Sequence, residues 1–167
     1  MTDVTSFLLE RNDWIPNNPQ LPVLVYSSAI AIEGDDPAAL FEQTFRANGW
    51  PPQFRYHVYD FHHYHTQGHE VLGVAQGHAR LMLGGPGGRE VQVSAGDVLL
   101  LPGGTGHCSV ESSPDFLVVG AYPPGQQGDI CTQAPSPEQW QNLANLALPQ
   151  QDPVEGEHGA LSQHWGK

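Results

Sequence analysis

The sequence predicts an all-β fold, a sandwich or a barrel, with two short helices at its periphery. Strand-like segments follow one another from Arg55 to Tyr122, with turn signals every six to twelve residues. The 19 glycines and 15 prolines are scattered as turn residues and do not gather in a low-complexity tract. The length of 167 residues suits one domain whose core needs no disulfide support.

The first third of the chain is expected to hold two strands and a helix. Thr5–Glu10 resembles a short strand, and Pro22–Tyr26 is a second strand-like run after a loop rich in Asn and Pro. A helix is expected near Asp36–Gly49. Asp36 can cap its start, a proline occupies the first helical position, and a glycine can close its end.

The middle of the chain is the strand-rich part. From Arg55 to His65 the residues alternate with a period of two, which is typical of a strand. The further expected strands are Glu70–Gln76, His78–Leu83, Arg89–Ser94, Asp97–Leu101, His107–Glu111 and Asp115–Tyr122.

The last part of the chain is expected to hold the second helix, near Ser136–Leu148. Ser136 and Gln139 have the spacing of a capping box, and a proline follows the first of them. The tail after Gln150 is polar, but three apolar side chains favour docking onto the domain: Val154, Leu161 and Trp165.

Composition excludes several classes of function. The net charge is −12 with only six Lys and Arg, which argues against nucleic acid and against an anionic membrane surface as partners. No apolar run is long enough to span a bilayer, and no signal peptide pattern opens the chain, so a cytoplasmic protein is expected. Cys108 and Cys131 form no CxxC motif. Reduced thiols are expected, and their pairing stays open.

Histidine is concentrated in one region. Seven of the nine histidines lie between His57 and His107, and four of those fall in the eight residues from His62 to His69. Such a cluster on a strand-like pattern favours a metal site over isolated packing histidines. No GxSxG motif or P-loop supports a hydrolase triad or a nucleotide site.

Two spaced motifs carry a resemblance to a known family. The first is His63-Tyr-His65, four residues, Glu70, six residues, Gly77, and the second is Gly96, five residues, Pro102-Gly-Gly104, two residues, His107. They resemble the two conserved motifs of the cupin superfamily. The segments PNNPQLPVLVY, FHHYHTQGHEVLGVAQG and FLVVGAYPPG, with the DPVEGEHG tail, are similar to the YjlB-like group of cupin-domain proteins.

The resemblance implies a single jelly-roll β-barrel domain over residues 1–167. Its core would cover about 53–123, preceded by strands and a helix in 1–52 and followed by a helix and tail in 124–167. It also implies a homodimer, for which the strand Thr5–Glu10 is the expected contact, because an uncovered edge invites pairing.

The expected metal ligands are His63, His65, Glu70 and His107. His63 and His65 are two apart on a strand and so share a face, while Glu70 and His107 can reach the same point from other strands. Three imidazoles and one carboxylate suit one divalent transition metal per chain: Fe, Mn, Ni, Co, Cu or Zn. In an octahedral ion they would leave two positions for water, substrate or dioxygen.

Alternation around these ligands predicts a pocket. The expected inward residues are His57, Tyr59, Phe61, Leu72, Val74, Gln76, Ser109 and Glu111, of which Tyr59, Gln76 and Glu111 are candidate polar contacts. Their alternative role is to fill the barrel. His62 should face the opposite way from His63. His69 has three open roles, as a turn residue, a hydrogen-bonding partner behind the ligands, or a substituted ligand.

Two functions follow from this site. One is a metalloenzyme for a small molecule, of the oxygenase, isomerase or decarboxylase type, with Glu111 or Tyr59 assisting acid–base steps. The other is a non-catalytic protein in which the metal is structural or coordinates a small ligand. Glu111 stands where the family pattern often has Asn, so no substrate is transferred from the resemblance.

Overall fold

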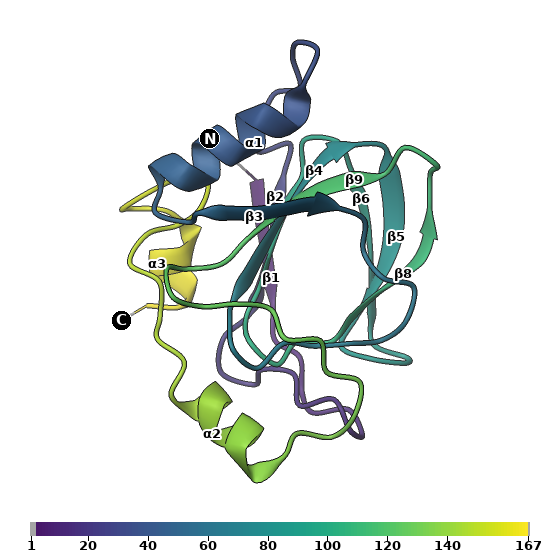
Figure 1. The fold of residues 1–167 in the computed structure, drawn as a ribbon, viewed down its shortest axis with the longest axis vertical. Helices are drawn as coiled ribbons and strands as arrows, with labels where there is room; N and C mark the ends of the chain where they lie inside the picture. The colour runs from purple at the N-terminus through teal and green to yellow at the C-terminus, as the bar shows by residue number, and fades with distance from the viewer. Residues whose placement is uncertain (1–2, 167) are drawn as a thin grey trace.

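The computed structural model describes residues 3–166 as two antiparallel sheets and three short helices (Figure 1). The larger sheet has six strands in the order β1 (Asp3–Phe7), β2 (Val23–Ser27), β7 (Val98–Leu101), β4 (Glu70–Gln76), β9 (Leu117–Ala121) and β3 (Pro52–Tyr56). The smaller sheet has three, in the order β6 (Arg89–Ser94), β5 (His78–Leu83) and β8 (His107–Ser112).

The inner core lies between the two sheets. Leu72 and Leu99 of the larger sheet belong to the same buried cluster as Leu81 and Val93 of the smaller sheet. Burying a side chain of this size contributes roughly 1.5–3 kcal/mol, so this cluster holds the sheets together. The β-rich prediction is therefore confirmed. Within residues 3–166 neither sheet closes on itself.

The outer face of the larger sheet is covered by two helices (Figure 1). Phe41 and Phe45 of α1 (Pro37–Ala47) are fully buried in the outer core. The tail docks there through Leu161 of α3 (Ala160–His164), a helix that was not expected, and through Trp165. The Trp165 indole N–H donates to the carbonyl of Pro22 at 2.8 Å.

The two expected helices exist with shorter bounds. α1 has Asp36 at its N-cap but no side-chain cap, because the Asp36 carboxylate pairs with Arg55 instead. α2 (Pro137–Ala144) has the expected capping box, in which Gln139 N–H donates to Ser136 Oγ at 3.1 Å. In the part of the chain that the structure describes, no helix has the length and apolar character to cross a bilayer.

The expected strand Arg55–His65 is only partly formed. β3 ends at Tyr56, and beyond it the chain runs beside β8 with an irregular pairing. The Ser109 N–H donates to the Tyr59 carbonyl at 2.8 Å, and His63 and His107 exchange two backbone hydrogen bonds of 3.2 and 2.9 Å. Four positions separate Tyr59 from His63, but only two separate Ser109 from His107, so the extra residues loop out.

Two β-bulges change which residues face the predicted pocket. Val74 pairs with Val118 but Gln76 pairs with Leu117, so Ala75 is an extra residue in β4. Alternation fails beyond such a residue, and Gln76 is exposed.

The edge strand β1 covers Asp3–Phe7 and pairs only with β2 among residues 3–166. The homodimer through this strand stays a prediction, and the expected domain's ends at 1–2 and 167 lie outside the described residues.

The second bulge lies in β8, where Arg80 pairs with Glu111 but Leu81 pairs with Ser109. The extra residue is Val110, and Glu111 therefore points to the outer surface, where its carboxylate lies 3.2 Å from Arg80. The prediction that Glu111 contacts the pocket is wrong for this reason.

Candidate metal centre

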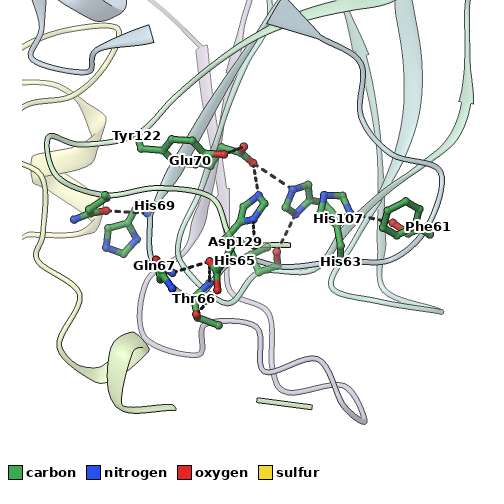
Figure 2. A network of polar contacts seen from close by, with 12 residues as sticks. Phe61, His63, His65, Thr66, Gln67, His69, Glu70, His107, Tyr122 and Asp129 are labelled. Atoms are coloured by element: carbon green, nitrogen blue, oxygen red, sulfur yellow. Dashed lines mark hydrogen bonds and ion pairs between the residues drawn. The ribbon is translucent and has the colours of Figure 1, made fainter. Parts of the chain in front are cut away.

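The four expected ligands lie close to one another (Figure 2). Glu70 is the first residue of β4 in the larger sheet, and His107 is the first residue of β8 in the smaller one. His63 and His65 lie on the segment that leads into β4, and the bridge between His63 and His107 fixes this segment to β8. All four side chains are buried.

The distances bring the four side chains to one point. One nitrogen of each imidazole of His63, His65 and His107 lies within 4.8 Å of the others. The Glu70 Oε1 lies 3.2 Å from the Nε2 of His65 and 3.2 Å from the Nε2 of His107. A carboxylate oxygen and imidazole nitrogens are suitable donors for a divalent transition metal, so the residues present fit such an ion.

The orientation of the three imidazoles is set from behind by backbone carbonyls. His63 Nδ1 lies 3.0 Å from the Phe61 carbonyl, His107 Nδ1 lies 3.0 Å from the Thr105 carbonyl, and His65 Nδ1 lies 2.6 Å from the Asp129 carbonyl. A carbonyl only accepts hydrogen bonds, so each Nδ1 carries a hydrogen, and each Nε2 is the atom that can present a lone pair to an ion once it carries no proton. Metal-binding histidines are held in this way.

Burial and charge act in opposite directions within the cluster. Burial lowers the pKa of His63 to about 3, helped by the neighbouring His107. Burial also opposes the charged form of His65, but the Glu70 carboxylate outweighs it and raises the pKa of His65 to about 9. The two imidazoles hold the pKa of Glu70 well below its usual range despite full burial. Without metal, a proton on His65 is therefore paired with the Glu70 carboxylate.

Two residues of the site escaped the sequence analysis. The Tyr122 hydroxyl, just after β9, donates to Glu70 Oε2 at 2.8 Å, which leaves Oε1 facing the histidines. Asp129 accepts the His65 hydrogen bond, and its carboxylate accepts the Thr66 and Gln67 N–H groups at 2.8 and 3.0 Å. The pairing of Val71 with Ala121 places Tyr122 beside Glu70, but no local pattern reveals that register.

A cavity of about 450 Å³ opens onto the cluster. The expected pocket residues His57, Tyr59 and Leu72 line it, together with Tyr122, which was not expected. The expected pocket residue Phe61 is not part of this lining: it is 43 % exposed and stacks on Tyr59, with ring centroids 4.9 Å apart and planes 18° apart. The remaining lining residues are Phe54, Arg55, Tyr56, Val58, His63, His65, Glu70, His107, Gly128 and Ile130.

The other two of the four histidines between positions 62 and 69 lie apart from the expected ligands. His62 is outside the three-imidazole group, and its Nδ1 is buried without a hydrogen-bond partner. His69 Nδ1 accepts the Gly103 N–H at 2.9 Å, and its ring lies 4.9 Å from the Trp165 ring. Figure 2 shows the His69 ring set apart from the three imidazoles. His69 is thus part of the packing around Trp165.

Comparison with known proteins gives one informative relative. The chain is 37% identical over 155 residues to "Uncharacterized protein YjlB" of Bacillus subtilis (strain 168), covering 92% of this chain and 91% of that protein. No protein-family model matches the chain.

Proposed function

Because the chain belongs to the YjlB family, and because its three imidazoles aim their Nε2 atoms at one point beside Glu70, we propose that it is a metal-binding protein of the cupin type and a metalloenzyme for a small molecule. The two antiparallel sheets, with the ligands at the end of the inner space, are compatible with a cupin jelly roll. The fold alone does not decide the activity.

The observation that carries the proposal is the set of three Nδ1–H groups held by backbone carbonyls. Histidines that only fill a core need no common orientation, whereas histidines that share an ion need their lone pairs to converge. His63, His65, His107 and Glu70 would hold the ion. A divalent ion in that place would supply Lewis acidity next to the cavity.

The residues of this chain have separate tasks in such a site. Tyr122 holds the carboxylate of Glu70 in place, and the Asp129 carbonyl orients His65. Tyr59 and Leu72 provide the walls against which a small molecule would rest, and they keep water from that side of the site. The cavity makes an enzyme a better proposal than a purely structural metal site, which is normally closed to ligands.

The test is metal content measured on untagged protein, with single alanine changes. We expect one divalent ion per chain in the native protein, and a strong loss of the ion in His63→Ala, His65→Ala and His107→Ala. His62→Ala is the matched control, because it removes the adjacent histidine outside the cluster. Equal metal loss in His62→Ala and His63→Ala, or a native protein without any ion, would overturn the proposal.

A further inference from the structure

We propose that the molecule taken up by the cavity is planar and aromatic, and that its acidic groups are phenol- or enol-type oxygens facing the histidine cluster, with no carboxylate or phosphate. This inference rests on the proposed function, because the metal ion would hold those oxygens. Three features of the cavity carry it: a wall of aromatic rings, the lack of a free guanidinium or ammonium group among the described lining residues, and apolar side chains in the exposed part of its lining.

The wall of rings runs from the surface to the ligand histidines. The ring centroids of Tyr56 and His57 are 3.9 Å apart, those of His57 and Tyr59 are 6.2 Å apart, and those of Tyr59 and His63 are 5.3 Å apart. The first three residues line the cavity, as does the ligand His63. Aromatic rings at such separations favour a flat ring beside them in stacked or edge-on contact.

The space available matches a molecule of one or two rings. The cavity volume of about 450 Å³ falls in the lower half of the ~300–1,000 Å³ range typical of small-molecule sites. Leu72 and Ile130 contribute aliphatic surface to the same cavity. A flat apolar molecule can therefore contact rings and aliphatic side chains together.

The charges exclude a phosphorylated or dicarboxylic ligand. Arg55 is the one Lys or Arg among the lining residues, and its guanidinium makes four hydrogen bonds of 2.8–3.1 Å to Asp36 and Glu42. Among residues 3–166, no free guanidinium or ammonium group lines the cavity to pair with a second anionic group, and buried anions require such a partner. The Glu70 carboxylate and the net charge of −12 further disfavour a polyanion.

Apolar side chains form part of the exposed lining of the cavity. Tyr56 and Ile130 line the cavity and are 47 % and 49 % exposed, and Phe61, which stacks on Tyr59, is 43 % exposed. Single exposed apolar side chains are ordinary, but two that line the same cavity, with a third stacked on a lining ring, favour a surface that receives an apolar molecule.

The experiment compares two probes on protein loaded with Co²⁺: 4-nitrocatechol, a flat phenolic chelator, and malate, an aliphatic dicarboxylate. Elemental analysis first establishes the Co²⁺ content of each sample. Tyr59→Leu should weaken 4-nitrocatechol binding by about two- to tenfold, the range of one aromatic contact. Malate should bind the native protein more weakly than 4-nitrocatechol does, and this weak binding should be unchanged in Tyr59→Leu. Trp140→Leu is the control, since it removes an exposed ring of α2 outside the cavity.

The outcomes separate the two proposals. If the protein takes up no Co²⁺, the proposed metal site is wrong, and the proposed ligand class is overturned as well. If Co²⁺ is bound but Tyr59→Leu binds 4-nitrocatechol as tightly as the native protein, only the ligand class is overturned. A loss of malate affinity equal to that of 4-nitrocatechol would also overturn it, because the ring of Tyr59 would then serve any ligand.

Discussion

Two carboxylates lie buried on opposite faces of the larger sheet, and each accepts a hydrogen bond from a tyrosine. Glu70 is 3 % exposed on the inner face and accepts from Tyr122 at 2.8 Å. Asp152 is 1 % exposed on the outer face and accepts from Tyr26 at 2.7 Å. The two sites look alike in burial and in this one partner.

Their remaining partners differ. Asp152 accepts the backbone N–H groups of Val154, Glu155 and Leu161 at 2.7–2.9 Å, which ties the tail to the sheet. Glu70 faces two imidazole Nε2 atoms instead. A peptide N–H cannot give up its hydrogen at ordinary pH, whereas an imidazole can exchange a proton for a metal ion. The partners, and not burial, therefore distinguish a structural carboxylate from one that could bind a metal ion.

The largest expected effects come from neutralising each carboxylate. Asp152→Asn leaves two of its donors without an acceptor and should lower the free energy of unfolding by about 2–4 kcal/mol, with metal affinity unchanged. Glu70→Gln should lower metal affinity more than 100-fold and the free energy of unfolding by less than about 1 kcal/mol, because the imidazoles can become neutral. Urea unfolding measures the stability, and metal titration measures the affinity. An equal loss of stability in both variants would contradict the different roles assigned to Asp152 and Glu70.

A smaller effect is expected from the two tyrosines. Tyr26→Phe should lower the free energy of unfolding by about 1.5–3 kcal/mol, the value of a hydrogen bond to a charged group. Tyr122→Phe should lower metal affinity by about 10-fold, as for other groups that hold a metal ligand in place. Metal affinity unchanged in Tyr122→Phe, measured by competition with a chelator, would contradict the role assigned to Tyr122.

The proton paired with Glu70 predicts how metal affinity depends on pH. His65 has a pKa of about 9 without metal, so below that value an ion must displace its proton. His63, with a pKa of about 3, stays neutral throughout. Affinity should therefore rise about tenfold per pH unit from pH 6 to 8 and level off near pH 9. Calorimetry in two buffers should count about one proton released per ion. A count of zero would show that His65 is neutral before binding.

The smallest effect on metal binding is expected at His69, the neighbour of Glu70. His69→Ala should change metal affinity less than about threefold, because its ring packs on Trp165 and not on the ligands. The variant should still lose about 1–3 kcal/mol of stability, since the Gly103 N–H loses its acceptor. A decrease in metal affinity of 10-fold or more in His69→Ala would show that His69 contributes to the metal site.

The grouping of the candidate ligands could be predicted from the sequence because their spacing is local. His63, His65 and Glu70 lie within eight residues, and His107 follows a Gly/Pro turn at the start of a strand. The two helices and the docking of the tail carried equally local signals. These features depend on residues that are neighbours along the chain.

The rest of the site could not be predicted, for two physical reasons. The extra residues Ala75 and Val110 break the alternation that placed Gln76 and Glu111 in the pocket, and neither residue marks a bulge by its type. Tyr122 and Asp129 reach the site through strand register and loop contacts with residues more than fifty positions away. A single sequence carries no signal for such contacts.

The hydrogen bond from His65 to Asp129 also has a consequence for the order of folding. His63 and His107 are each oriented by a carbonyl two residues away, so their rings can be set as soon as the local chain is in place. The ring of His65 is oriented by the Asp129 carbonyl, which lies 64 residues further along the chain. A nascent chain that ends before Asp129 therefore presents two oriented imidazoles, and the third is fixed only when the segment after β9 has closed a long loop.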